Sequence, residues 1–172
     1  CGDNVEAVAQ QRERLERQVK QMVRLVDDLL DVSRVSTGKL RLNAEPVTLQ
    51  EVCEAAIDIS RPLLEKARLQ LTVHLPQEPI ALEGDRVRLT QVFSNLLNNS
   101  AKYTEAGGSV SLAAQADGDR AVVKVRDTGV GISPEVLPRI FELFTQVDRS
   151  LNRSQGGLGV GLALVRRFVE LH

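Results

Sequence analysis

The chain has 172 residues, of which 26% are charged, and a net charge of −1 at pH 7. This length supports one well-cored domain plus an appendage, and the balanced charge provides no basic field for binding nucleic acid. The sequence contains no tryptophan and 3% aromatic residues, which argues against base-stacking platforms for single-stranded nucleic acid.

The first predicted element is a long helix from Glu6 to Val35, a stretch without glycine or proline. Its apolar residues recur in steps of four and three, which is the heptad pattern of a packed helical seam. The seam residues are Leu15, Val19, Met22, Val26 and Leu29, and Leu25, Leu30, Val32 and Val35 widen the apolar face. This width favours a helical bundle over a simple coiled coil, and Ser36-Thr37-Gly38 supplies a glycine stop. A surface helix folded onto the next domain is the alternative.

The next segments predict a strand, a helix and a second strand. We expect a short strand from Lys39 to Glu45 and a helix from Thr48 to Ala67 with a break at Pro62. Leu69 to Leu75 alternates and contains β-branched residues, so we expect a strand there. His74 lies on the more polar side of that strand, and we interpret it as a solvated surface residue rather than a catalytic one.

The following segments add a helix and a hairpin. Ile80 to Leu82 leads to Asp85, the predicted N-cap of a helix that runs to Tyr103. Ser109 to Ala116 and Arg120 to Asp127 predict a hairpin around an Asp-Gly-Asp turn. This alternation of helices and strands predicts an α+β fold. We expect a two-layer α/β sandwich, with a mixed β-sheet covered by helices on one face and preceded by the long bundle-type helix.

The helix that ends at Tyr103 carries three asparagines, Asn95, Asn98 and Asn99. Asn95, Asn99 and Lys102 recur at i, i+4 and i+7, which places them on one face. An amide oxygen suits Mg²⁺, which also takes oxygens from substrate phosphates, and an ammonium group can neutralise the same phosphates. The alternative is a solvent-exposed polar face without a binding role. Because asparagine is unfavourable in the interior of a helix, the pattern favours a binding role.

Two glycine clusters flank a polar loop further along the chain. The first is Asp127-Thr128-Gly129-Val130-Gly131, and the second is Gly157-Leu158-Gly159-Val160-Gly161. Glycine lets backbone N–H groups approach a ligand closely. The second cluster runs into an apolar segment, Leu162 to Val165, that predicts a helix start, and helix N-termini bind anions. The clusters predict a phosphate cradle, although each alone is also consistent with a simple turn.

Together these motifs resemble the ATP-binding domain of sensor histidine kinases, within the wider family of DNA gyrase, heat-shock chaperone and mismatch-repair ATPases. The asparagine helix resembles the N box of that family, and the clusters at Asp127 and Gly157 resemble its two glycine boxes. Phe141-Glu142-Leu143-Phe144 resembles its F box. The resemblance covers nearly the whole chain, from about Gln10 to His172, and implies the two-layer sandwich fold.

The resemblance also implies roles for individual residues. Asp127 would accept a hydrogen bond from the adenine amine, and Gly129 and Gly131 would let the backbone close over the base. Asn99 would hold Mg²⁺ through its side-chain oxygen. Three residues would line the phosphate side of the pocket: Asn95, Lys102 and Tyr103. The resemblance implies that Asn95 and Lys102 are catalytic.

The implied lid covers the triphosphate. It would run from Thr145 to Gln155, with Arg149 and Arg153 as its cations and Arg153 as the weaker candidate for a phosphate contact. The remaining cofactor-binding residues implied by the resemblance are Phe144, Gly157, Gly159 and Gly161.

One position favours a kinase over an ATPase. Related ATPases carry a glutamate one helical turn before the magnesium asparagine, where it activates a water molecule. Asn95 stands at that position here. An amide cannot take a proton at neutral pH and cannot act as the general base, so transfer to a protein side chain fits better than hydrolysis.

Two features depart from the family pattern. The phosphoacceptor histidine of the family lies in a His-Glu-type motif on the first helix of a hairpin, but this chain contains only His74 and His172, and neither has that context. We therefore expect residues 1–38 to be the second helix of the dimerisation and phosphotransfer hairpin, with the first helix absent. The second departure is at the C-terminal end. Residues 39–172 would form the ATP-binding domain, and the last core strands of this domain in the family would be absent.

The resemblance implies the ATP-binding catalytic portion of a two-component sensor histidine kinase. The kinase would transfer the γ-phosphoryl group of Mg·ATP to a histidine, and from there the group would pass to an aspartate of a response-regulator receiver domain. A homodimer would form through the N-terminal helix. The alternative is a catalytically inactive nucleotide-binding interaction module, either truncated or a pseudokinase.

Cysteine usage and hydropathy indicate the compartment. Cys1 and Cys53 have no metal-type spacing, so we expect free thiols in a reducing compartment. No apolar run approaches the roughly 18 to 20 residues that a membrane span requires. We expect a cytoplasmic location without membrane contact by this segment, although the parent protein can be membrane-anchored.

Overall fold

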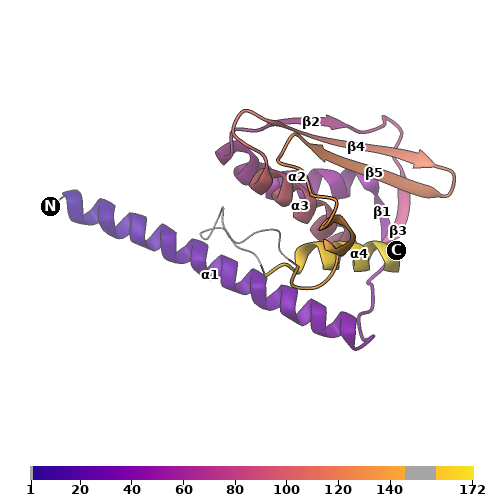
Figure 1. The fold of residues 1–172 in the computed structure, drawn as a ribbon, viewed down its shortest axis with the longest axis horizontal. Helices are drawn as coiled ribbons and strands as arrows, with labels where there is room; N and C mark the ends of the chain where they lie inside the picture. The colour runs from indigo at the N-terminus through magenta and orange to yellow at the C-terminus, as the bar shows by residue number, and fades with distance from the viewer. Residues whose placement is uncertain (1, 146–157) are drawn as a thin grey trace. The chain divides into compact units, whose positions relative to one another are not determined.

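The computed structural model describes residues 2–145 and 158–172, and the chain divides into two units, Cys1–Leu40 and Arg41–His172. The first unit contains helix α1 (Gly2–Ser36), drawn in indigo in Figure 1. The predicted long helix is therefore confirmed. Gly38 follows it with a φ of 64°, a left-handed conformation that favours glycine after a helix.

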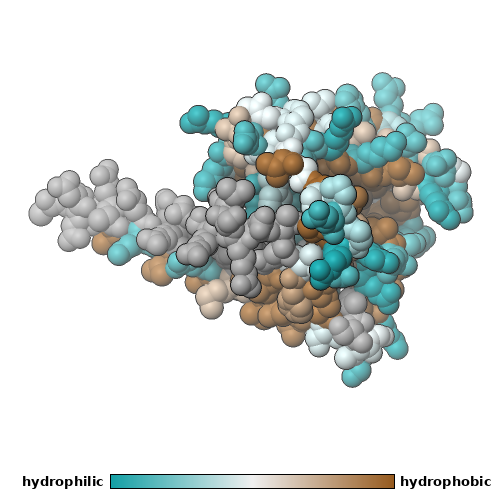
Figure 2. Space-filling model, viewed as in Figure 1, coloured by the Kyte–Doolittle hydropathy of each residue, from teal (hydrophilic) through white to brown (hydrophobic). Residues whose placement is uncertain are grey.

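Several seam side chains of α1 are exposed. Leu15, Met22 and Leu29 are 59%, 65% and 45% exposed. Figure 2 shows the apolar surface, in brown, along the described part of this helix. No helix in the described part of the chain is long and apolar enough to cross a membrane.

The second unit combines helices with a mixed sheet, which confirms the predicted α+β class. Its elements are β1 (Glu45–Thr48), α2 (Leu49–Lys66), β2 (Gln70–His74), β3 (Ala81–Gly84), α3 (Arg86–Tyr103), β4 (Ser109–Asp117), β5 (Arg120–Asp127), a 3₁₀ helix (Leu137–Arg139) and α4 (Gly161–Leu171). β1 and β3 form an antiparallel pair, whereas β4 lies between a parallel β2 and an antiparallel β5. Helices α2 and α3 lie on one face of the three-stranded sheet (Figure 1).

Helix α3 is the central packing element of this unit, because it contacts both α2 and α4. Its Val92, Phe93 and Leu97 are buried, as are Leu112 on β4 and Phe168 on α4. Burial of such side chains is the main stabilising contribution to a fold. The polar residues of α3 are therefore presented from a well-packed helix.

Two local predictions were wrong. The strand expected at Lys39 to Glu45 lies instead at Glu45–Thr48, because its partner β3 pairs only with those residues. Upstream, the backbone N–H of Asn43 donates to the Asp85 carboxylate at 2.9 Å instead of joining a ladder. The break expected at Pro62 is absent, and α2 continues through it. Pro62 is exposed, so water can satisfy the carbonyl that loses its helical donor.

The predicted hairpin is confirmed, and the structure adds a helix cap that was not predicted. β4 and β5 pair up to Asp117 and Arg120, and Gly118 has a φ of 61° in the turn. Thr48 begins α2 with a capping box, in which its hydroxyl accepts from the Glu51 N–H and the Glu51 carboxylate accepts from the Thr48 N–H. This backbone hydrogen bond lowers the pKa of Glu51. His74 is exposed, as expected.

Asp85 caps α3 and joins three segments of the second unit. Its carboxylate accepts from the Arg88 N–H at 3.1 Å and from the Asn43 N–H at 2.9 Å. Its own N–H donates to Nε2 of His172 at 2.9 Å, and Nδ1 of that ring lies 2.6 Å from the Phe168 carbonyl. The network connects the start of α3 to the end of α4.

We expect Asp85→Ala to lower the free energy of unfolding by about 2 kcal/mol, because it removes a helix cap and leaves a partly buried N–H without its acceptor. Urea denaturation measures this change. Asp58→Ala is the control, since the Asp58 side chain is 74% exposed and contacts only Arg61 among the ion pairs of the described residues. It should change stability by less than about 0.5 kcal/mol. Equal effects of the two substitutions would contradict the role given to Asp85.

Candidate functional site

The end of β5 lies against the last turns of α3. The Asp127 carboxylate accepts a hydrogen bond from the Ser100 hydroxyl at 3.0 Å and another from the Gly129 N–H at 3.0 Å. The Val130 N–H donates to the Tyr103 carbonyl at 3.2 Å. The first glycine cluster is therefore fixed to the helix that carries the asparagines.

Gly129 is required at this junction. A Cβ there would lie 2.5 Å from the Tyr103 carbonyl oxygen and 2.9 Å from an oxygen of Asp127. Any side chain would separate the loop from α3 or displace the carboxylate. Gly131 differs, because its surroundings are open and its φ of 72° is what favours glycine.

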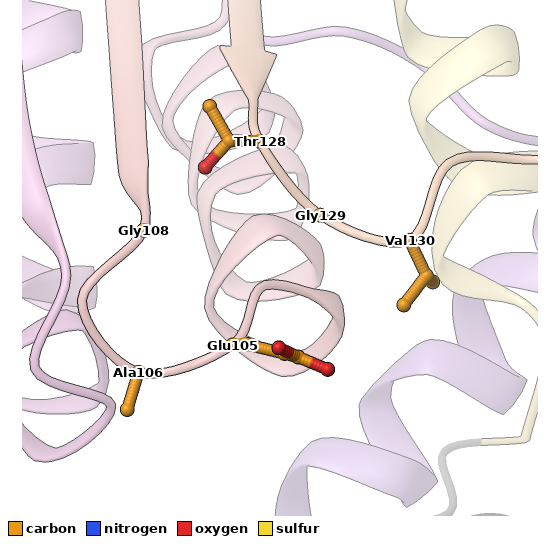
Figure 3. A pocket seen from close by; sticks show the side chains of 6 residues that line it. All are labelled: Glu105, Ala106, Gly108, Thr128, Gly129 and Val130. Atoms are coloured by element: carbon orange, nitrogen blue, oxygen red, sulfur yellow. The ribbon is translucent and has the colours of Figure 1, made fainter.

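A small pocket lies beside this junction. Its volume is about 370 Å³. Figure 3 shows the loop from Thr128 to Val130 on one side and the turn from Glu105 to Gly108 on the other. Of the predicted site residues that the structure describes, only Gly129 lines it. The asparagine face of α3 lies outside this pocket.

The asparagine face adjoins the start of α4. A Cβ on Gly161, the first residue of α4, would lie 3.8 Å from Cγ and Nδ2 of Asn95. Nδ2 of Asn95 and Oδ1 of Asn98 are buried without a hydrogen-bond partner among the described residues. Asn99 is half-buried one turn after Asn95. Because buried amide groups are normally hydrogen-bonded, the unpartnered Nδ2 fits a site that a polar ligand or water completes.

The N-terminus of α4 is suited to an anion. Val160 precedes the helix without a side-chain cap, and the first turn contains no acidic residue. The first N–H groups of a helix have no partner within the helix, and its dipole is positive at that end. An uncapped helix start beside a buried amide donor has the chemistry of an anion-binding site, which is compatible with the phosphate cradle expected from the sequence.

The segment of the F box is tied to the second glycine cluster. The Phe144 N–H donates to the Gly159 carbonyl at 3.0 Å. Both residues have a positive φ, 63° for Phe144 and 71° for Gly159. For phenylalanine this conformation is strained, and such strain concentrates at functional segments.

Other predicted residues are placed differently or lie outside the described residues. The Lys102 ammonium lies over the ring of Tyr103, 4.8 Å from its centroid, a cation–π contact between sequence neighbours. Arg149, Arg153 and Gly157, and most of the predicted lid, lie outside the described residues.

Sequence reasoning overlooked two hydroxyl residues. Ser100 is 3% exposed and bonded to Asp127, and the Thr128 hydroxyl accepts from the Ser109 N–H at 3.0 Å. A serine on the packed face of a helix, here in the last turn of α3, is the signal that could have suggested such a partner. Cys53 is also buried, and desolvation raises the pKa of its thiol to about 11, so it stays protonated and takes no part in the site.

Comparison with known proteins gives one consistent result. Residues 84–172 match the family model described as histidine kinase-, DNA gyrase B- and HSP90-like ATPase. The chain is 38% identical over 156 residues to the circadian input-output histidine kinase CikA of Synechococcus elongatus. This alignment covers 88% of this chain and 20% of that protein. The chain therefore spans about one fifth of this curated relative.

Solved structures give the same picture. The mycobacterial sensor histidine kinase MprB is 31% identical with a TM-score of 0.63, covering 75% of this chain and 80% of that one. Full-length ShkA in complex with AMPPNP is 31% identical with a TM-score of 0.76, covering 92% of this chain and 33% of that one.

Proposed function

The chain belongs to the histidine kinase-, DNA gyrase B- and HSP90-like ATPase family, and we propose that it is the ATP-binding catalytic portion of a two-component sensor histidine kinase. In this role it binds Mg·ATP and passes the γ-phosphoryl group to a histidine, from which a receiver-domain aspartate of a response regulator takes it. This reaction belongs in the cytoplasm, where ATP is available.

One observation carries the proposal. The buried and unpartnered amide of Asn95 adjoins the uncapped start of α4 at Gly161. Phosphate oxygens would accept from that amide and from the first N–H groups of the helix. Phosphoryl transfer requires mainly positioning and charge neutralisation, so such a cradle supplies much of what the reaction needs.

Other residues would hold the adenine and the metal. Asp127 would accept from the adenine amine, with Gly129 and Gly131 allowing the backbone to close over the base. Asn99 would contribute one oxygen to Mg²⁺, which is typically held by one or two protein groups together with phosphates and waters. When bound, Mg²⁺ neutralises charge on the phosphates.

The residues around the phosphates favour transfer over hydrolysis. Asn95 stands where a general base would have to lie, and an amide cannot accept a proton at neutral pH. Lys102 is a candidate catalytic cation, provided that its ammonium leaves the ring of Tyr103 when phosphate is present. The remaining nucleotide-binding candidates are Phe144, Gly157, Gly159 and Gly161. A lid from Thr145 to Gln155 would cover the triphosphate, with Arg153 as a candidate phosphate contact.

Mg²⁺-dependent nucleotide binding tests this assignment. We expect Asn99→Ala to abolish the gain in ATP affinity that Mg²⁺ produces, because the variant lacks the proposed amide ligand. Isothermal titration with and without Mg²⁺ measures the gain. Asn43→Ala is the control, because within the described residues Asn43 forms a hydrogen bond only through its backbone N–H, and this variant should keep the full magnesium dependence. A full magnesium gain in Asn99→Ala would overturn the metal assignment.

The exposed stripe of α1 supports a homodimer through this helix, formed with a symmetry mate or a second hairpin helix. Met22 and Val26 are 65% and 54% exposed, and a wide apolar stripe favours association. We expect Met22→Glu to weaken self-association by roughly tenfold or more, because a charge would be buried at the seam. Light scattering across a concentration series measures this. Asp27→Lys, one position after Val26 and outside the stripe, should leave association unchanged. A monomeric unmodified chain at high micromolar concentration would contradict the dimer.

A further inference from the structure

Ser100 is placed to control the carboxylate of Asp127. It lies on α3, is 3% exposed, and its hydroxyl donates to Oδ2 of Asp127 at 3.0 Å. The helix that carries it contacts both α2 and α4, so the backbone that presents the hydroxyl is held in place. A hydroxyl that donates to a carboxylate makes a charge-assisted hydrogen bond, which is stronger than a neutral one.

The two oxygens of Asp127 are held by different donors. Ser100 holds Oδ2, and the Gly129 N–H holds Oδ1 at 3.0 Å. Two fixed donors determine the plane of the carboxylate. Asp127 is nevertheless exposed, so its carboxylate is accessible to a ligand.

We infer that Ser100 is a positioning residue that makes the site selective for a base with an exocyclic amine over one with a carbonyl at the same position. This inference rests on the proposed adenine contact of Asp127. A carboxylate can only accept hydrogen bonds, so it attracts an amine and repels a carbonyl oxygen, and the two fixed donors keep it oriented for this discrimination. Without the Ser100 donor the carboxylate can rotate, and part of that selectivity is lost.

Paired nucleotide affinities test the inference. ATP and inosine triphosphate share their ribose and phosphates but carry an amine and a carbonyl, respectively, at the position that Asp127 would read. We expect Ser100→Ala to weaken ATP binding by roughly threefold to tenfold, while inosine triphosphate binding changes less than about twofold. The ratio of the two affinities therefore falls. Isothermal titration with Mg²⁺ gives both constants.

Ser94→Ala is the matched control. Ser94 lies on the same helix, is 8% exposed, and donates to the Gln91 carbonyl at 3.2 Å rather than to Asp127. It should leave the affinity ratio unchanged. An equal loss of both nucleotides in Ser100→Ala would show a general structural role and overturn the inference.

Asp127→Asn separates this inference from the proposed function. If Asp127→Asn weakens ATP binding but Ser100→Ala does not, the role of Ser100 is wrong and the adenine contact stands. If neither substitution weakens ATP binding, the adenine contact itself is wrong, and the role of Ser100 falls with it.

Discussion

Asp127→Asn is expected to weaken ATP binding by about tenfold to a hundredfold, equivalent to roughly 1.5 to 3 kcal/mol for a hydrogen bond to a charged group. The carboxylate offers only acceptors to the adenine amine, whereas an amide can turn a donor toward it. The Ser100 hydroxyl can reverse and accept from the new amide, so the fold itself should tolerate the change.

The same titrations and a thermal unfolding curve check both parts of this result. Asp119→Asn is the control, because Asp119 lies in the β4–β5 turn with its side chain 96% exposed, and it should keep normal affinity. Unchanged ATP affinity in Asp127→Asn would exclude this residue from base recognition. A large loss of stability would instead show that the carboxylate serves the fold.

Elements with local signals could be predicted from the sequence. The long helix before Gly38 follows from its heptad spacing, and the cap at Asp85 follows from a capping residue placed before an apolar pattern. The hairpin around Gly118 follows from its turn residues. In each case the information lies within a few residues of the element.

Elements that depend on distant partners could not be predicted in the same way. The position of β1 is set by the short strand β3, which lies more than thirty residues further on. Continuation of α2 through Pro62 depends on exposure of that side of the helix. Both are cases in which tertiary context overrides local propensity.

The site shows the same division. The asparagine face follows from helical spacing, but its approach to Gly161 at the start of α4 is a long-range contact. The Ser100 hydroxyl meets Asp127 across 27 positions of sequence. Spacing alone does not reveal such a pair, because it depends on how β5 lies against α3.

When a separate histidine-bearing helical hairpin is mixed with this chain and Mg·ATP, we expect the hairpin to become phosphorylated. The product should be acid-labile and base-stable, as a phosphoramidate is. The chain itself should remain mostly unlabelled. Of its two histidines, His172 has both ring nitrogens engaged, by the Asp85 N–H and the Phe168 carbonyl. His74 is exposed on β2, and His74→Ala identifies any label that it takes. Radiolabelled ATP and acid or base treatment of the gel measure these products.

Hydrolysis distinguishes the proposed kinase activity from that of the ATPases of the same family. Position 95 carries an amide rather than a carboxylate, and an amide cannot activate a water molecule. The chain alone should therefore release phosphate very slowly. Asn95→Glu would introduce a potential base, but its pKa and the position of the water need not follow. We therefore expect a gain below about tenfold, where a positioned general base contributes on the order of 10² to 10⁴. Rapid phosphate release by the unmodified chain with Mg·ATP would mean that water, not histidine, is the acceptor, and the kinase proposal would have to be withdrawn.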